Sequence, residues 1–598
     1  MLNPNNRSLY TSALTSPPGM VFDEAIATSF SLDPAFLLQA PVYLAFTATD
    51  SNRAQDPLSI FEAIRRYSER ITVYVQKGRI QIPIKLKPNP LFGLLEEMIA
   101  ESTAKGRGVF HPKTWAIRFI NPETDEVMYR LVVLSRNLTT DSSWDLSLQL
   151  DGYPVKRKQS ANKALVHLFS TLPKRATGKM AKHRRAQAQR FADELLYVEW
   201  ECPAGFDEVA FFLPGEGYDW QPPESDRAVV ISPFCTDEAL QHIVKHCQQA
   251  DALISRPDTL LALSEETRGL FTRQLHLDDA AEEQASDENT PDDIIASGLH
   301  AKAYLFENGQ DSELVLGSAN ATNAALLGKT NCEILVSLKG KKKHIGTIDD
   351  LLSSDGMESY LQDFDPAQPF EPDVLRVEAE SHVEQARELL ADAELTLHCH
   401  PGGNDQSWAL WLVGEIPELP GIVQATAWPV TVSDGLGCSL LDPADGNKRA
   451  LGEFSVPAIT GLTAFSLKTS HPDVSVRFVL NLPIDTLPPD RHAMILQSSM
   501  QKQDFLRYLL MLIGEAGQQS FFAENAFGDG HFFTRLASGE EFAVLEELTR
   551  IYSREPERLK DIAALIGNMR KGQSDMIPQD FLALWAVFES AMGGRNGR

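Results

Sequence analysis

The chain has 598 residues, of which 43% are hydrophobic and 23% charged, a composition that argues against a collagen-like, coiled-coil or wholly disordered protein. At roughly 100–200 residues per domain, this length predicts three to five domains. The 55 basic and 82 acidic side chains give a net charge of −27, which disfavours a nonspecific coat on nucleic acid or a protein of the membrane surface.

The N-terminal sequence shows no basic segment leading into an apolar core, as a secretory signal would. The longest apolar stretch, residues 505–513, is far shorter than the roughly 20 residues of a membrane span. The six cysteines are scattered and form no CxxC pair, which disfavours a disulfide framework or a zinc ribbon. We therefore expect a cytoplasmic protein with reduced thiols.

The first part of the chain alternates between strand-like and helix-like patterns. Residues 41–48 and 71–75 are predicted strands, and 54–70 is a predicted helix between them. Further on, a strand pattern at 229–234 precedes a helical pattern over 237–249. This alternation predicts an α/β fold.

Two segments of opposite charge interrupt the alternation. Residues 156–190 carry eleven basic side chains and no acid, whereas residues 278–293 carry eight acids and no Lys or Arg. The basic segment is either a solvated helical face or an arm that follows phosphates and releases counterions. The residues predicted to bind nucleic acid are Lys156, Arg157, Lys158, Lys174, Arg175, Lys179, Lys182, Arg184 and Arg185. The acidic run is expected to be a solvated loop, with mimicry of nucleic acid as the alternative.

The pattern changes after residue 371. A helix over 374–391 precedes short strands rich in turn residues, which predicts a separate β domain, and from about residue 488 the pattern is helical. His398 and His400 share a strand face, but two ligands without a third nearby do not indicate a metal site. The predicted domains are residues 1–200, 201–370, 371–485 and 486–598.

One polar motif occurs twice in the α/β region. Each copy has His-x-Lys, then Ser-x-Asn with Thr two residues later, then an acid seven residues before a glycine. The copies are His111, Lys113, Ser135, Asn137 and Asp145 in the first, and His300, Lys302, Ser318, Asn320 and Glu333 in the second. Agreement in residue type and order indicates an internal repeat rather than chance.

The spacing within each copy predicts a shared face. Residues i and i+2 of a strand point to the same side, so His and Lys share a face, as do Ser and Asn. Facing residues of an antiparallel hairpin have a constant sum of residue numbers. Sums of 248 and 620 would gather the four polar side chains of each copy on one face, with wide turns centred on Thr124 and Gln310. A two-residue turn at Asn308-Gly309 would instead split them across two faces.

The paired HxK and SxN motifs resemble those of the phospholipase D superfamily. The second copy, with Gly317-Ser318-Ala-Asn320 and Glu333, is most similar to the bacterial nuclease and tyrosyl-DNA phosphodiesterase branches. The resemblance covers about residues 20–345. It implies two pseudo-symmetric halves, each a mixed sheet flanked by helices, that meet at one metal-free site.

The resemblance also implies a role for each residue. One histidine attacks phosphorus and the other protonates the leaving oxygen, with His111 favoured as the nucleophile and His300 as the acid. Lys113, Lys302, Asn137 and Asn320 would hold the phosphoryl oxygens, Ser135 and Ser318 would support them, and Asp145 and Glu333 would orient the histidines. This chemistry is reasonable without the family, since fixed cations offset the phosphodiester charge and imidazole reacts near neutral pH.

Two departures from the family pattern keep alternatives open. The family has Asp five residues after the Lys, where this chain has Arg118 and Glu307, and Leu134 replaces the Gly before the first Ser. A phospholipase is therefore disfavoured, and a catalytically weak subunit that binds nucleic acid or a partner remains an alternative.

The sequence thus predicts a metal-independent phosphodiesterase, a nuclease that acts on nucleic acid, DNA rather than RNA. No cofactor is implied, because no nucleotide-binding or hydrolase motif occurs. A protein partner is expected to bind through residues 371–598. A role in a bacterial defence or DNA-processing system is inferred by analogy alone.

Overall fold

The computed structural model describes residues 13–38, 67–82, 88–106, 108–139, 143–278, 298–328, 330–367, 373–403, 407–443 and 445–488, with a few single positions outside these ranges. Four sequence predictions lie wholly or largely outside the described residues. They are the strand at 41–48, the helix over 54–70, the acidic run after residue 278 and the helical module 486–598.

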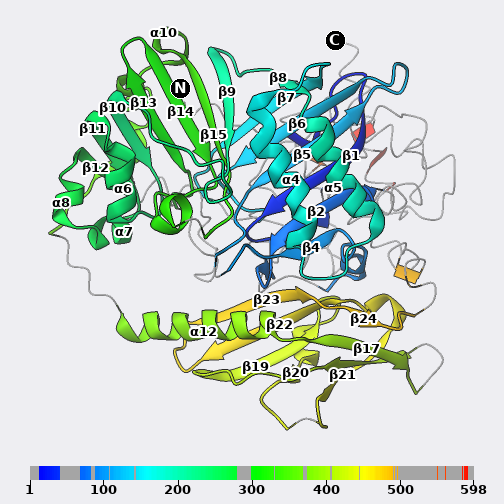
Figure 1. Cartoon of the computed structure of the whole chain (residues 1–598). Coiled ribbons are helices and arrows are strands. Elements are labelled where there is room, and N and C mark those ends of the chain that lie inside the picture. Colours follow the sequence, from blue (N-terminus) through cyan, green and yellow to red (C-terminus); the bar gives the residue numbers. More distant parts are fainter. Residues whose placement is uncertain are drawn as a thin grey trace.

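The first sheet has seven strands in the order β4-β2-β1-β5-β6-β7-β8 (Figure 1). The bounds are β1 Val21–Ser29, β2 Ile71–Gln76, β4 Ile99–Ser102, β5 Thr114–Ile120, β6 Val127–Leu134, β7 Ser147–Pro154 and β8 Val198–Trp200. β1, β2 and β4 are parallel, whereas β5, β6 and β7 continue from β1 as antiparallel neighbours. Helices α4 (Lys163–Arg175) and α5 (Lys182–Leu195) cover one face.

The second sheet has eight strands in the order β16-β12-β11-β10-β13-β14-β15-β9. The bounds are β9 Phe206–Phe212, β10 Ser225–Ile231, β11 Cys247–Ile254, β12 Phe271–Leu277, β13 Ala303–Asn308, β14 Asp311–Gly317, β15 Leu335–Lys341 and β16 Leu361–Asp363. Here too three parallel strands, β10, β11 and β12, continue into the antiparallel series β13, β14 and β15. The short helices are α6 Asp237–Val244, α7 Pro257–Ala262, α8 Glu265–Arg268, α10 Lys342–Ile345 and α11 Ile348–Leu351.

The predicted helix over 237–249 is too long. Helix α6 ends at Val244, and Cys247 begins β11, because the run from Ala250 to Ile254 is buried as a parallel strand that pairs with both β10 and β12. The predicted α/β class itself is confirmed, since the described chain forms several mixed sheets with few helices.

One hydrophobic core joins the two sheets. It contains Phe169 of α4 and Phe191 of α5 together with Val229, Leu305 and Val336 of the second sheet. Helix α4 contributes through residues spaced three and four apart, as an amphipathic helix does, namely Leu165, Leu168, Phe169 and Leu172. Because the sheets share this core, their motif-bearing strand ends are held in a fixed relation.

Residues 373–488 form an accessory domain below the first sheet in Figure 1. It consists of α12 (Val374–Asp392) and two sheets, ordered β21-β18-β17-β24 and β20-β19-β22-β23-β3. The strand bounds are β17 Thr396–Pro401, β18 Ser407–Val413, β19 Ile422–Pro429, β20 Cys438–Ser439, β21 Lys448–Ser455, β22 Leu462–Thr469, β23 Ser475–Asn481 and β24 Ile484–Asp485. The five-stranded sheet of this domain ends with β3 (Ile80–Gln81), which comes from the N-terminal part of the chain and pairs with β23. None of the helices in the described parts of the chain has the length and apolar character needed to cross a membrane.

Candidate active site

Both HxK motifs lie directly before a strand, and both SxN motifs directly after one. The hairpins pair Thr114 with Val133 and Ala303 with Leu316, so facing residue numbers sum to 247 and 619. The predicted sums and the wide turn at residue 310 are therefore wrong, because residues 309 and 310 form a two-residue turn. The two HxK and two SxN motifs all lie just outside the paired strands, at the same end of each hairpin. This common end, and not a shared face of the hairpin, brings the polar side chains together.

The two copies contact each other through their backbones. The amide of His111 donates to the carbonyl of Cys332, and the amide of His300 donates to the carbonyl of Trp144, both over 2.9 Å. Parallel β-bridges accompany both contacts. Each histidine therefore lies beside the residue that precedes the acid of the other copy.

His111 has a close acidic partner. Its Nδ1 lies 2.8 Å from Oε2 of the buried Glu333, and its Nε2 lies 2.7 Å from Nζ of Lys113. The carboxylate makes Nδ1 the donor and leaves Nε2 with the lone pair. Burial lowers the pKa of His111 to about 4, with Lys113 and Lys302 contributing and Glu333 opposing. His111 is therefore uncharged at neutral pH, as a nucleophile must be.

His300 has a looser acidic partner. Its Nδ1 lies 3.9 Å from Oδ1 of Asp145, whose other oxygen lies 3.6 Å from Nε of Arg136. The side chain of His300 is 29% exposed, against 14% for His111. His300 is the more accessible imidazole and is suited to exchange protons with a leaving group and with water.

Ser135 and Ser318 make matching contacts. Each Oγ accepts a hydrogen bond from the backbone amide that follows the acid, over 2.8 Å and 3.0 Å. Each also donates to that acid, Ser135 to Asp145 over 3.3 Å and Ser318 to Glu333 over 2.5 Å. Each serine therefore fixes the carboxylate that faces the histidine of the other copy.

Two lysines and two asparagines complete the cluster. Lys113 and Lys302 are almost fully buried, and burial together with the charge of Lys302 lowers the pKa of Lys113 well below its usual value. Within the described residues, Oδ1 of Asn137 and Oδ1 of Asn320 are buried without a hydrogen-bond partner. A side-chain amide can also turn to present its NH2 group, so the cluster can bind an anion that carries several oxygens.

Sequence analysis missed Phe30 and Arg79. Phe30 follows β1, and its ring packs edge-on against the His111 ring with the centroids 5.1 Å apart. The guanidinium carbon of Arg79 lies 4.9 Å from the Phe30 centroid. Neither residue belongs to a repeated motif, so only the fold brings them to the site.

The residues that depart from the family pattern lie away from this cluster. Glu307 is buried, accepts a hydrogen bond from the amide of Ile348 (2.6 Å) and pairs with Lys342 (2.8 Å). Arg118 pairs with Glu194 over 3.0 Å. Both positions lie five residues along a strand from the motif lysine, or about 16 Å at 3.3 Å per residue, so they brace the sheets.

The basic segment does not act as one surface. Arg184 is buried and donates to the carbonyls of Ile71 (2.6 Å) and Ser68 (3.2 Å), and buried Arg175 pairs with Glu216 over 2.9 Å. The prediction that these two arginines bind nucleic acid is wrong, because both guanidinium groups serve the fold. The exposed members of the predicted set are Lys156, Arg157, Lys158, Lys174, Lys179, Lys182 and Arg185.

The exposed cations lie at different distances from the site. Helix α4 ends beside β4, where the carbonyl of Arg175 accepts from Thr103, so Lys174 lies at the motif end of the first sheet. Lys179 comes three residues after Ala176, which forms a β-bridge with Ser102 at the end of β4. Lys156 and Arg157 follow the far end of β7, about 23 Å from its motif end at seven residue steps.

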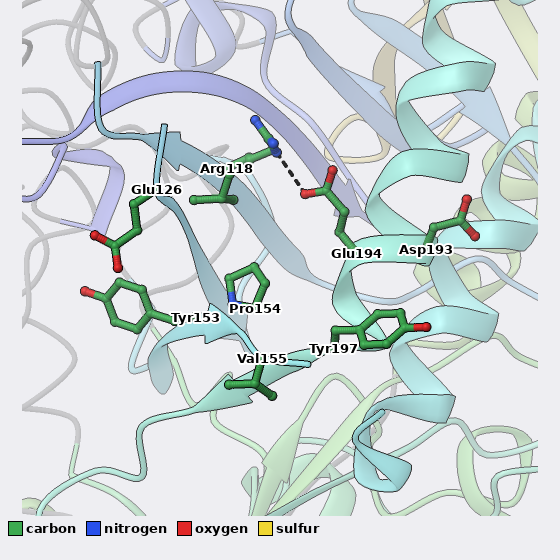
Figure 2. Close-up of a pocket in the computed structure, with 9 residues that line it drawn as sticks. Arg118, Glu126, Tyr153, Pro154, Val155, Asp193, Glu194 and Tyr197 are labelled. Atoms are coloured by element: carbon green, nitrogen blue, oxygen red, sulfur yellow. Dashed lines mark hydrogen bonds and ion pairs between the residues drawn. The ribbon is translucent and has the colours of Figure 1, made fainter. Parts of the chain in front are cut away.

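Figure 2 shows a pocket at that far end. It is lined by Arg118, Tyr153, Glu194 and Tyr197 among others, and Arg118 points to Glu194 across it. None of the motif residues lines this pocket. It is therefore separate from the cluster around His111.

No family model and no curated protein matches the sequence. Among solved structures, the chain is similar to yeast tyrosyl-DNA phosphodiesterase, with 12% identity and a TM-score of 0.32 over 54% of this chain and 84% of that one. It is also similar to polyphosphate kinase from Porphyromonas gingivalis (15%, TM-score 0.28, 55% and 41%) and to phosphatidylserine synthase from Haemophilus influenzae Rd KW20 (11%, TM-score 0.33, 64% and 91%).

Proposed function

We propose that this chain is a metal-independent phosphodiesterase of the phospholipase D superfamily that cleaves nucleic acid through a phosphohistidine. The crossed pairing of His111 with Glu333 and of His300 with Asp145 supports this most strongly. Because each pair takes one member from each copy, neither copy alone forms a site. The charge of a bound phosphodiester favours the protonated form of the buried lysines, which then supply the positive charge that this anion requires.

The first step uses the lone pair of His111. In the free protein, Lys113 contacts Nε2 of His111. An arriving phosphoryl oxygen takes over the hydrogen bond of Lys113 and so releases the lone pair. Nε2 then forms a bond to phosphorus, the bond from phosphorus to the leaving oxygen breaks, and His300 gives its proton to that oxygen. Glu333 stabilises the positive imidazole ring that results.

The second step returns the protein to its starting state. His300, now neutral, takes a proton from water, and the water oxygen attacks phosphorus. The bond from phosphorus to Nε2 breaks, and the electron pair returns to His111. Asn137 and Asn320 hold the phosphoryl oxygens through both steps, and Asp145 orients His300.

We also propose that the two sheets are pseudo-symmetric halves of one catalytic unit. The matching orders β2-β1-β5-β6-β7 and β11-β10-β13-β14-β15 support this. So do Gly152 and Gly340, since a Cβ built at either would lie 2.6 Å from a backbone oxygen beside the next strand. The matching serine contacts favour two working copies over a catalytically weak subunit.

The test is hydrolysis of a thymidine p-nitrophenyl phosphodiester in EDTA by the wild type, His111→Asn and His300→Asn. The wild type should remain active, and His111→Asn should be inactive. His300→Asn should release one burst of nitrophenolate and accumulate acid-labile phosphohistidine, because this leaving group needs no proton. A burst from His111→Asn would exchange the two roles. Loss of activity in EDTA with recovery in Mg²⁺ would exclude the mechanism.

A second test asks whether nucleic acid is the substrate, by removing positive charge either near the candidate site or far from it and measuring DNA binding. Lys174→Gln with Lys179→Gln removes charge at the motif end, and Lys156→Gln with Arg157→Gln removes the same charge at the far end. The first pair should lower the salt dependence of DNA binding by about 0.7–0.9 in slope for each phosphate that the protein no longer neutralises. The second pair is the matched control and should leave the slope unchanged. If the salt dependence of DNA binding has the same slope in both double variants, nucleic acid does not approach the site past the end of α4.

A further inference from the structure

The turn after β2 lies between the candidate active site and the accessory domain. On the site side, Oε1 of Gln76 accepts a hydrogen bond from the amide of Phe110 (2.7 Å), the residue before His111. Three residues later, Arg79 lies over the ring of Phe30, which packs against His111. One short segment therefore touches both the backbone and the ring environment of this histidine.

The accessory domain holds the same turn from the other side. β3 pairs with β23, Val479 facing Ile80. Buried Glu101 accepts from the amides of Gly78 and Asn481, both over 3.0 Å, and so joins the turn to β23. At Gly78 (φ +73°) an added Cβ would lie 3.0 Å from Cβ of Ala391 on α12, so the helix packs directly against the turn.

Arg79 is fixed by the accessory domain. Its Nη2 lies 2.7 Å from Oε2 of Glu384 on α12, and its Nη1 lies 3.4 Å from Oε1. Both arms of the guanidinium are thus held by one carboxylate on a 19-residue helix. A planar guanidinium held in this way has a defined orientation, so it can restrain the aromatic ring beneath it.

The second half has an arginine over a phenylalanine as well, with Arg256 lying 5.5 Å from the centroid of Phe234. There the phenylalanine is 43% exposed, and Arg256 pairs with Asp258 of the same half over 3.5 Å. The pair beside His111 differs in that its arginine is held by another domain.

From these contacts we infer that Glu384, Arg79 and Phe30 are positioning residues for His111, through which the accessory domain sets the reactivity of this histidine. This inference rests on the proposed function in taking His111 as the nucleophile. The restraint is needed because the reacting atom of His111 is Nε2, whose direction follows from the rotation of the ring. Glu333 restrains one edge of that ring, and Phe30 restrains it from outside the hydrogen-bond network.

The first experiment does not depend on turnover. Diethyl pyrocarbonate modifies neutral imidazole, and peptide mass spectrometry gives a separate rate for His111 and for His300. Phe30→Ala should raise the rate at His111 several-fold and Glu384→Ala should raise it to a smaller extent, while the rate at His300 stays constant as an internal reference. The matched control is Glu380→Ala, which removes a carboxylate one turn earlier on α12 that pairs with exposed Arg376 (3.0 Å). It should change neither rate.

The second experiment is a double-variant cycle on turnover of the nitrophenyl substrate. Phe30→Ala should lower kcat by about 10- to 100-fold and Glu384→Ala by about 3- to 10-fold, with KM unchanged, because misplacement of a reacting group by about 1 Å costs up to 100-fold. Glu384→Ala should have no further effect in the Phe30→Ala background, since the link is already cut. Arg79→Met provides the same cut if Phe30→Ala does not fold.

Several outcomes would overturn the inference. If Glu384→Ala behaves like Glu380→Ala at His111, the accessory domain does not restrain the ring. If the effects of Glu384→Ala and Phe30→Ala multiply, the two residues act independently and only support the fold. If the wild type hydrolyses no phosphodiester but the modification rates follow the expected pattern, the proposed function fails and the positioning link stands.

Discussion

Replacing Glu333 with Gln should slow the attack on phosphorus far more than replacing Asp145 with Asn. The contact between Glu333 and His111 is 2.8 Å long and buried. A hydrogen bond to a charged group contributes about 1.5–3 kcal/mol, or about 10- to 150-fold in rate at 1.4 kcal/mol per factor of ten. Gln preserves the shape and the acceptor but removes the charge that stabilises the positive imidazole ring formed during attack.

Asp145→Asn acts on the other step. The separation of 3.9 Å from His300 and the partial exposure of the imidazole place this pair among the weaker ion pairs, at about 0.5–1 kcal/mol or about two- to fivefold in rate. The loss should be seen only when the leaving group needs a proton. An alkyl phosphodiester of thymidine should therefore reveal it, and the nitrophenyl ester should not.

Rapid-quench measurement of the first turnover separates these effects. Glu333→Gln should slow the burst with both esters, whereas Asp145→Asn should leave the nitrophenolate burst intact. If Asp145→Asn slows that burst more than Glu333→Gln, the nucleophile is His300. If each acid variant impairs the histidine of its own copy, the crossed arrangement is not the working one.

Two further predictions follow from burial. Because burial lowers the pKa of His111 to about 4, the nitrophenolate burst should stay constant from pH 7 to 5 and fall through pH 4, and a fall near pH 6.5 would refute this. Stability in urea denaturation should decrease as the pH is lowered from about 6.5 to about 4, since in this range the unfolded state binds a proton at His111 that the folded state does not. Glu307→Ala should destabilise the fold by about 3 kcal/mol in urea denaturation, because it leaves the amide of Ile348 and the charge of Lys342 without their buried partner, and the folded variant should keep its burst rate.

The motifs could be found in the sequence because the same residue types recur in the same order. Their geometry could not be found in this way. The alternation of side chains applies inside a ladder, and it fails one residue beyond the end of a strand, where Lys113 and Ser318 lie. The pairing of His111 with Glu333 was also hidden, because it depends on how the two sheets share one core and not on distance along the chain.

The burial of Arg184 could have been predicted from its spacing. It lies three, four and seven residues before Gln187, Ala188 and Phe191, which is the buried stripe of α5. Charge counting alone treated all basic residues of the segment as equal. The pairing of β3 with β23 left no trace in the sequence, since a two-residue strand is too short to show a pattern.

The second copy has Gly317 before its serine, where the first copy has Leu134. We expect Gly317→Ala to displace site residues by forcing the backbone to move. A Cβ at Gly317 (φ +153°) would lie 2.2 Å from the carbonyl oxygen of Ile334, so β14 and β15 would have to separate at their motif ends. That movement displaces Ser318 and Glu333 together, since one follows Gly317 directly and the other precedes Ile334. The expected cost is about 1–3 kcal/mol in urea denaturation for the strain.

The burst of nitrophenolate should fall beyond what this loss of stability explains, because Glu333 no longer aligns His111. Leu134→Ala, the change at the matching position of the first copy, is the control. It should also lose stability, by about 2–4 kcal/mol for a buried leucine, but it introduces no backbone clash and should keep the burst. If both variants keep the burst equally, the close approach at Gly317 serves packing alone and does not position the acid that faces His111.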